Sequence, residues 1–262
     1  MAIKLTTTSE SINCVKALAY GESGVGKTWL CQTAPSPVII SAEKGLLTLK
    51  NVKIPVIEIS SFQDLEEAYH FIVGSEHAKD FKTVCLDSIT DIAETILGEE
   101  KLNAGRDPRQ AYGAYADKLL PMIKKFRDLS DRNVYFTAKM KRMTDDFTGI
   151  TSFGPSMPGQ QLGQNLPYLF DFCLAIRIGV TEEGVKYRYL QTEGDIQYVA
   201  KARGGMLDNV EEPHLGKLFN KALGIEESKP EKKKKKAEPK AEDKKSEAKS
   251  SEQKISKELL AE

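Results

Sequence analysis

Long hydrophobic stretches are missing from this sequence of 262 residues, and the first ten positions are polar overall. A membrane-spanning helix needs about 20 consecutive apolar residues, and a secretory signal needs an apolar segment near the start of the chain. The sequence therefore predicts neither a membrane span nor a signal peptide. We expect a cytoplasmic protein without a membrane partner.

Paired cysteines are also missing. Cys14, Cys31, Cys85 and Cys173 form no C-x-x-C pair, and the last two lie in apolar, strand-like segments. Isolated cysteines of this kind are typical of buried thiols in a reducing compartment. The three histidines are widely spaced and have no Cys or His neighbour at ligand spacing, so the sequence does not predict a zinc site.

The chain has no formal net charge, because 38 basic residues balance 38 acidic ones. Residues 226–262 hold 12 of the lysines and 10 of the acidic residues, with no aromatic residue. Such a stretch cannot bury a core, so we expect a disordered Lys/Glu-rich tail after a folded domain of residues 1–225. That domain keeps 26 basic and 28 acidic residues. It is not generally basic, so any nucleic acid must meet particular loops or an assembled oligomer.

The chain contains one complete sequence motif, the phosphate loop. Residues 21–28, GESGVGKT, match the phosphate-loop pattern G-x-x-x-x-G-K-[ST] and directly follow an apolar run. Glycines let consecutive backbone N–H groups face phosphates at the start of the following helix, whereas the alternative is an ordinary glycine-rich turn. Lys27 would reach the terminal phosphates and Thr28 a Mg²⁺ ion, so the sequence predicts a site for ATP and Mg²⁺. The predicted nucleotide-binding residues are Gly21, Glu22, Ser23, Gly24, Val25, Gly26, Lys27, Thr28 and Trp29.

Short apolar runs alternate with helix-period segments, which is typical of a parallel sheet covered by helices. The predicted strands are Val15–Tyr20, Val38–Ser41, Val56–Ile59, Val84–Asp87 and Val134–Ala138, and the predicted helices include Phe62–Val73, capped by Ser61, about Gln110–Asp131, and Pro213–Leu223. Further strands at Cys173–Ile178, Val185–Leu190 and Ile196–Lys201 are separated by short turns. We therefore predict an α/β fold with a mainly parallel central sheet that ends in antiparallel strands.

Two of these strands end in acidic residues. Asp87 is the candidate carboxylate on the metal side, and its alternative role is the N-cap of a helix at Ile89–Leu97. Glu43 follows the strand Val38–Ser41, and it is either the general base that polarises the attacking water or an exposed turn acid. The residues alone leave both alternatives open for Glu43.

Four segments in order, GESGVGKT, IISAEKGL, VCLDSIT and VYFTAKMKR, resemble the RecA-like P-loop ATPase core over nearly all of residues 12–205. The resemblance implies that Glu43 activates water and that Lys139 senses the γ-phosphate. Classical recombinases carry Gln where this chain has Lys139, and we expect no N-terminal filament-forming domain like theirs. We therefore do not expect processive strand exchange.

The compact layout, the Tyr112-Gly113 segment and the charged tail are most similar to bacteriophage proteins with a RecA-like core that anneal single-stranded DNA. Lys201 and Arg203 form a Lys-x-Arg pair at the end of a predicted strand, where both side chains should point the same way. The pair resembles the trans-acting fingers of oligomeric RecA-like ATPases, which implies a homo-oligomeric ring or filament. The alternative is an edge strand protected by charge.

The polar, glycine-rich stretch from Lys139 to Pro167 is long for a connection and should contain a hairpin around residues 146–149. Phe147 and Phe153 could stack on bases, and the resemblance places single-stranded DNA here, whereas a flexible cover over the nucleotide is the alternative. Lys232–Lys236 in the tail would add attraction to DNA, and the tail could recruit a single-strand-binding protein.

The phosphate loop and the resemblance together imply two alternative functions. The first is an ATP-hydrolysing oligomer that acts on single-stranded DNA in phage recombination or annealing. The second is a non-catalytic ATP-bound switch or scaffold that recruits replication or recombination partners, with Glu43 idle. A helicase or packaging motor is disfavoured because no accessory domain is predicted.

Overall fold

The structure is a computed structural model that describes residues 7, 13–43, 45–105, 107–145 and 147–225. The predicted tail, residues 226–262 with Lys232–Lys236, lies outside the described residues.

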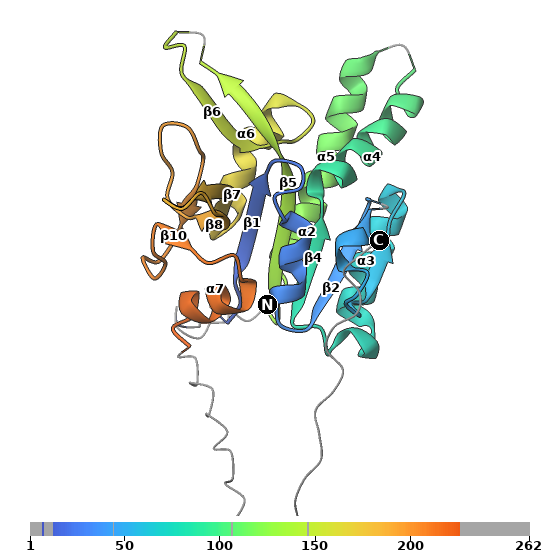
Figure 1. Cartoon of the computed structure of the whole chain (residues 1–262). Helices are drawn as coiled ribbons and strands as arrows, with labels where there is room; N and C mark the ends of the chain where they lie inside the picture. Colours follow the sequence, from blue (N-terminus) through green and yellow to red (C-terminus); the bar gives the residue numbers. More distant parts are fainter. Residues whose placement is uncertain (1–6, 8–12, 44, 106, 146, 226–262) are drawn as a thin grey trace, which may run out of the picture. The chain divides into compact units, whose positions relative to one another are not determined.

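A mainly parallel sheet forms the centre of the described domain (Figure 1). Its parallel strands, in spatial order, are β7 (Phe172–Val180), β1 (Lys16–Gly21), β5 (Asn133–Thr144), β4 (Thr83–Asp87), β2 (Pro37–Ser41) and β3 (Val56–Glu58). β5 therefore lies between the phosphate-loop strand β1 and the acid-ended strand β4. The predicted α/β fold with a mainly parallel sheet is confirmed.

The sheet ends in antiparallel strands beyond β7, as predicted. β8 (Lys186–Gln191) and β9 (Lys201–Ala202) both pair antiparallel with β7, and β10 (Val210–Glu211) pairs with β8. The predicted strand Ile196–Lys201 is wrong. In this segment Tyr198 forms only an isolated β-bridge, and the strand β9 begins at Lys201. Asp195 accepts hydrogen bonds from the backbone N–H groups of Gln197 and Tyr198, and this side-chain turn bends the chain where a strand was expected.

Helices cover both faces of the sheet. One face packs against α3 (Phe62–Gly74), α4 (Ile89–Asn103) and α5 (Pro108–Arg127), and the other against α2 (Lys27–Leu30) and α7 (Leu215–Ala222). Within β1, Leu18 belongs to the first core and Ala17 to the second, because strand side chains alternate between the faces. The side chains of the central strands are buried on both faces of the sheet, and this explains the continuous apolar runs in their sequence.

The helix ends agree with the sequence signals. Ser61 caps α3 by accepting a hydrogen bond from the backbone N–H of Asp64 at 3.0 Å, as predicted. Gly224 follows α7 with φ of 67°, in the left-handed region that favours glycine. The predicted helix Gln110–Asp131 corresponds to α5, which begins and ends a few residues earlier.

β5 is longer than predicted and projects from the sheet as a hairpin with β6 (Thr151–Pro155) (Figure 1). Asp145 accepts hydrogen bonds from the backbone N–H groups of Phe147 and Thr148 at the turn. The described residues on both sides of position 146 thus form the predicted hairpin.

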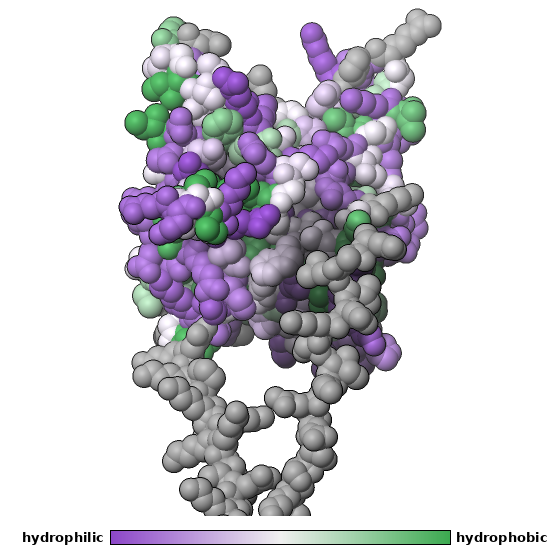
Figure 2. All heavy atoms as spheres, in the orientation of Figure 1, coloured by the Kyte–Doolittle hydropathy of each residue, from purple (hydrophilic) through white to green (hydrophobic). Residues whose placement is uncertain are grey.

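The thiols agree with the sequence in part, since Cys14 is only partly buried. The visible face of the described residues is largely hydrophilic, with apolar residues scattered among polar ones (Figure 2). Among the described residues, no helix combines the length and the apolar character needed to cross a membrane. All four cysteines are free, and Cys31, Cys85 and Cys173 are buried.

Candidate active site

The phosphate loop connects β1 to α2, and two of its glycines are required by geometry. Gly26 has φ of 106°, which side-chain-bearing residues rarely adopt. A Cβ atom on Gly21 would lie 2.8 Å from Cγ1 of Val25 and 3.0 Å from the carbonyl oxygen of Ile176. The chain can therefore leave the sheet and turn back along α2 only with glycine at these positions.

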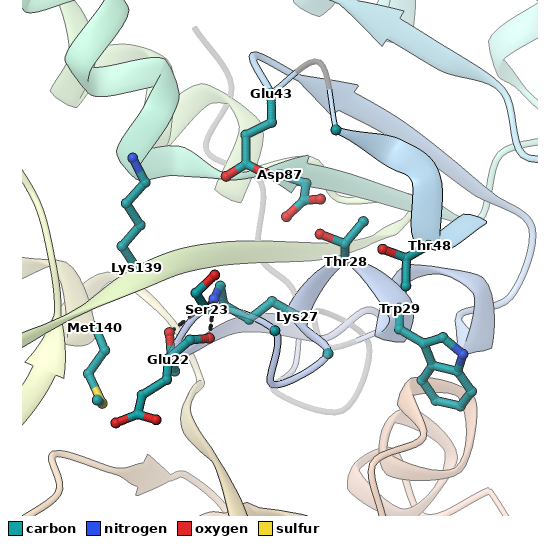
Figure 3. Close-up of a pocket in the computed structure, with 14 residues that line it drawn as sticks. Glu22, Ser23, Lys27, Thr28, Trp29, Glu43, Thr48, Asp87, Lys139 and Met140 are labelled. Carbon is teal, nitrogen blue, oxygen red and sulfur yellow. Dashed lines mark hydrogen bonds between the residues drawn. The ribbon is translucent and has the colours of Figure 1, made fainter. Parts of the chain in front are cut away.

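The loop borders a cavity of about 560 Å³, which we call the nucleotide cavity (Figure 3). Its lining residues are Gly21, Glu22, Ser23, Gly24, Gly26, Lys27, Thr28, Trp29, Glu43, Gly45, Thr48, Asp87, Lys139 and Met140. Eight of the nine predicted nucleotide-binding residues are among them. The exception is Val25, whose side chain is buried in the core between the sheet, α2 and α7.

Lys27 places its ammonium group against the loop itself. Its Nζ donates hydrogen bonds to the carbonyl oxygens of Gly21 at 3.0 Å and Glu22 at 2.8 Å. Burial lowers the pKa of Lys27, although the charges of Asp87 and Glu43 act in the opposite direction. A cation held in this way lies where the terminal phosphates of a nucleotide would be bound.

Asp87, at the end of β4, is 1% exposed and points toward the same cavity as Thr28 (Figure 3). Its Oδ1 accepts a hydrogen bond from the Thr137 hydroxyl, whereas its Oδ2 has no partner among the described residues. The alternative role of N-cap is wrong, because Ser88 caps α4. A buried carboxylate oxygen without a partner is costly unless a ligand meets it.

These groups fit a Mg²⁺ ion that arrives with a nucleotide. Among the described residues, no cluster of three His, Cys, Asp or Glu side chains is arranged to hold a metal alone. Mg²⁺ usually keeps several waters and adds phosphate oxygens and one or two protein ligands. The Thr28 hydroxyl would bind the ion with Asp87 beside it, and the ion would supply charge neutralisation at the phosphates.

Glu43 belongs to a charged cluster with Asp91, Lys139 and Glu94, which the sequence did not predict. A hydrogen bond with Asp91, burial, and the charges of Asp91 and Asp87 raise the pKa of Glu43 to about 7. Burial acts to raise the pKa of Asp91, but hydrogen bonds from Glu43, Lys139 and Ser88 outweigh it and lower that pKa. Glu43 is therefore a neutral or a charged acid depending on small changes around it.

Lys139 lines the nucleotide cavity, and its ammonium group pairs with Asp91 at 2.6 Å and with Glu94 at 2.9 Å. Asp91 thus joins the predicted base to the predicted phosphate sensor. The spacing of Ser88 and Asp91 is that of a capping box at the start of α4, and this signal could have located Asp91.

Replacing Asp91 with Asn should lower the pKa of Glu43, because it removes the neighbouring negative charge. The predicted general base can take a proton only when it is deprotonated, so the pH at which kcat/KM is half-maximal should then move down from about 7. A pH profile of ATP hydrolysis measures this shift. An unmoved midpoint would show that Asp91 does not control Glu43.

Arg188 is a second residue that the sequence did not reveal. It is exposed on β8, and its Cδ and Nε atoms lie 3.7 Å from where a Cβ of Gly26 would be. Among the described residues it has no ion pair. The antiparallel pairing of β7 with β8 brings this cation to the loop, and no local pattern specifies that register.

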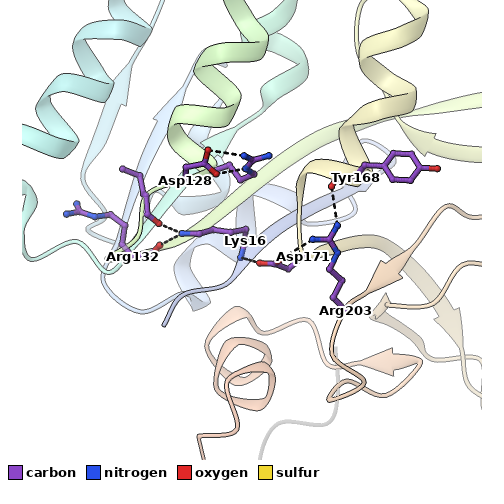
Figure 4. A network of polar contacts seen from close by, with 8 residues as sticks. Lys16, Asp128, Arg132, Tyr168, Asp171 and Arg203 are labelled. Carbon is purple, nitrogen blue, oxygen red and sulfur yellow. Dashed lines mark hydrogen bonds and ion pairs between the residues drawn. The ribbon is translucent and has the colours of Figure 1, made fainter. Parts of the chain in front are cut away.

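Lys201 and Arg203 do not join the nucleotide cavity of their own chain. Lys201 donates to the carbonyl oxygen of Pro167 at 2.7 Å, and Arg203 pairs with Asp171 at 3.7 Å (Figure 4). Asp171 in turn accepts a hydrogen bond from the backbone N–H of Lys16, the first residue of β1. The pair therefore lies at the amino end of β1, whereas the phosphate loop follows its carboxyl end.

A phosphate loop after β1, a buried carboxylate at the end of β4 and the strand β5 between them define a P-loop nucleotide-binding domain. The chain belongs to the AAA domain family, whose pattern matches residues 13–204.

Two solved structures show what the chain is similar to. One is a KaiC-like protein from the hyperthermophilic archaeon Pyrococcus horikoshii OT3, with 15% identity over 67% of this chain and 77% of that one, and a TM-score of 0.40. The other is an ATPase from the type III secretion system of pathogenic bacteria, with 15% identity, a TM-score of 0.42, and coverage of 64% of this chain and 52% of that one. No curated protein matches the chain.

Proposed function

We propose that this protein binds ATP with Mg²⁺, hydrolyses it, and acts as a homo-oligomer on single-stranded DNA in phage recombination or annealing. The observation that carries the ATPase proposal is the nucleotide cavity, where Lys27, Thr28, Glu43, Asp87 and Lys139 come together (Figure 3). These residues come from segments that are far apart in the sequence.

Each of these groups has a chemical task in the proposed reaction. Lys27 neutralises charge on the terminal phosphates, and Glu43 takes a proton from the attacking water. A pKa of about 7 suits a general base near neutral pH, because the base form is populated and still basic. Lys139, beside Glu43, would stabilise charge that develops on the phosphoryl oxygens.

The β5–β6 hairpin supports the DNA part of the proposal. Lys141 and Arg142 are exposed along β5, and Phe147 at the turn is fully exposed. Phe153 is less suited to stack on a base, because its ring packs on Tyr198 with 5.1 Å between centroids. Single-stranded DNA is bound by such a combination of cations and free aromatic rings.

Assembly would bring Lys201 and Arg203 to the nucleotide of a neighbouring subunit. Arg203 is more than half exposed, so it is accessible on the surface opposite the loop. The tail would add attraction to DNA or dock a single-strand-binding protein.

A second candidate function is a non-catalytic ATP-dependent switch or scaffold that recruits replication or recombination partners. The observation that favours it is the raised pKa of Glu43, to about 7, for which the neighbouring acid Asp91 is the main cause, because a protonated carboxyl cannot act as a base. In this alternative Glu43 stays protonated in the ATP-bound state, and binding alone changes partner affinity.

Turnover separates the two candidates. The steady-state ATPase rate is measured with and without single-stranded DNA, and Lys27→Ala protein serves as the control for contaminating activity. Hydrolysis that rises with DNA supports the first function. ATP binding without turnover under both conditions supports the switch.

Replacing Lys27 with Ala should weaken ATP binding by roughly 10- to 150-fold, because charge-assisted hydrogen bonds of about 1.5–3 kcal/mol are lost. The backbone cradle remains, so the melting temperature without nucleotide should change little. Isothermal titration with ATP and Mg²⁺ measures the loss. Normal ATP affinity in this variant would contradict the assignment of the loop.

A further inference from the structure

A second cavity, of about 760 Å³, lies between α5 and α6 (Gln160–Asn165) and shares no lining residue with the nucleotide cavity. We call it the α5–α6 cavity. Arg109, Tyr112, Tyr115, Asp117 and Asn165 contribute its polar groups, and leucine and alanine side chains contribute its apolar wall.

The phenol of Tyr115 is the most informative group in this cavity. Tyr115 is 1% exposed, and its hydroxyl has no hydrogen-bond partner among the described residues. Buried tyrosine hydroxyls are normally paired, and an unpaired one lowers stability. Burial, followed by the charge of Glu94, raises the pKa of Tyr115, so the group stays a neutral donor and acceptor. A lining group of this kind indicates a ligand with a polar edge.

The rim of the cavity combines an aromatic ring with cations. Tyr112 is 41% exposed, and the Nζ of Lys101 lies 5.6 Å from its ring centroid. Arg109, three residues earlier on α5, also lines the cavity. Gly159 has φ of 78°, and a Cβ there would lie 3.8 Å from Cδ1 of Tyr112. The backbone before α6 thus passes close to the ring.

We propose that the α5–α6 cavity receives a nucleobase of single-stranded DNA. The base packs against Tyr112, its polar edge meets the Tyr115 hydroxyl and the Asn165 amide, and Arg109 pairs with a flanking phosphate. Asp117 offers an acceptor for an exocyclic amine. A nucleobase and its phosphate offer a flat ring, a polar edge and an anion, and the cavity lining has a group to contact each of them. The proposal rests on the proposed action on single-stranded DNA.

The α5–α6 cavity is connected to the charged cluster of the nucleotide site through α4. Thr90 donates to the carbonyl oxygen of Ser156 at 2.8 Å and accepts from the backbone N–H of Lys139 at 3.0 Å. The backbone N–H of Ser156 donates to the carbonyl oxygen of Lys139 at 2.7 Å. Ser156 leads directly to Pro158 and Gly159 in the cavity lining. Hydrogen bonds through Ser156 and Thr90 therefore link the lining of the α5–α6 cavity to Lys139.

The test compares two oligonucleotides by fluorescence anisotropy in the presence of ATP and Mg²⁺. One carries thymine or adenine bases, and the other has the same backbone with abasic sites. The wild-type chain should bind the base-bearing strand more tightly. Tyr112→Leu should weaken binding to that strand by roughly 5- to 150-fold, and Tyr115→Phe by roughly 2- to 13-fold. Both should bind the abasic strand as the wild type does.

Tyr187→Leu is the matched control, because Tyr187 is 48% exposed on β8 and lies outside the α5–α6 cavity. It should leave the ratio of the two affinities unchanged. Tyr115→Phe removes a hydroxyl that has no partner, so the melting temperature should not fall and a binding defect is not a folding defect.

Four results would overturn the proposal in different ways. Base-dependent binding that Tyr112→Leu and Tyr115→Phe leave intact would place the base elsewhere and leave the proposed function standing. Equal affinity for both strands would show backbone binding alone. Absence of any binding to single-stranded DNA would remove the proposed function itself. Competition by a free deoxynucleoside monophosphate in the wild type but not in Tyr112→Leu, without strand binding, would assign the cavity to a mononucleotide.

Discussion

Replacing Glu43 with Gln should slow ATP hydrolysis by about 10²- to 10⁴-fold and leave ATP affinity unchanged, because the amide keeps the shape of the side chain but cannot accept the proton of water. Single-turnover hydrolysis measures the first quantity, and titration calorimetry measures the second. Glu43 lines the nucleotide cavity beside the phosphate loop, so its loss should slow the chemical step.

The control for this experiment is Glu58→Gln. Glu58 ends β3 beside Ser41 of β2, so it is another acid at the same edge of the sheet, but it lies outside the nucleotide cavity. Its replacement should leave the rate within about twofold. An unchanged rate in Glu43→Gln, with turnover intact, would make Glu43 a turn residue.

The pH dependence gives an independent check on the same residue. The pKa of Glu43 is raised to about 7, so kcat/KM should be low below that pH and rise as the carboxyl loses its proton. The Glu43→Gln variant should lack this rise. Ionisation of ATP itself affects both proteins equally, so the ratio of their rates isolates the contribution of Glu43.

The sequence predicted the buried centre of the fold well, because β1, β2 and β4 are buried on both faces and leave uninterrupted apolar runs. It also placed Asp87 and Glu43 at the carboxyl edge of the sheet, and the resemblance added Lys139; all three line the nucleotide cavity, since the carboxyl ends of parallel strands lie at one edge of a sheet. The extension of β5 to Thr144 was missed because those residues project from the core and carry no apolar pattern.

Contacts that depend on tertiary register could not be predicted. Arg188 reaches Gly26 only because β8 pairs with β7 in one register, and Asp91 meets Glu43 only because α4 begins beside the loop after β2. The α5–α6 cavity is formed by segments about 40 residues apart, Arg109–Leu120 and Pro158–Leu169. Tyr112 and Tyr115 share a helix face, and only the fold shows that one is exposed and the other buried.

A mixture of Arg203→Ala chains and Lys27→Ala chains should hydrolyse ATP, although neither variant alone does so well. Arg203 lies at the opposite end of β1 from its own phosphate loop, so any phosphate that it contacts must belong to a neighbouring subunit. A finger of this kind contributes about 10³–10⁵ in rate, so Arg203→Ala alone should lose most of its turnover. In a head-to-tail assembly, about a quarter of the interfaces of an equal random mixture would combine an intact loop with an intact Arg203.

The recovery should therefore approach about one quarter of the wild-type rate per chain, and it should require single-stranded DNA if assembly does. A mixture of Arg203→Ala chains with the double variant Lys27→Ala/Arg203→Ala is the matched control, because it contains no intact Arg203 and should stay inactive. Full turnover by Arg203→Ala alone would contradict the trans-acting role, as would a protein that stays monomeric with ATP and DNA. Lys201 and Arg203 would then serve to hold the segment from Pro167 to Asp171 against β9, where their present contacts lie.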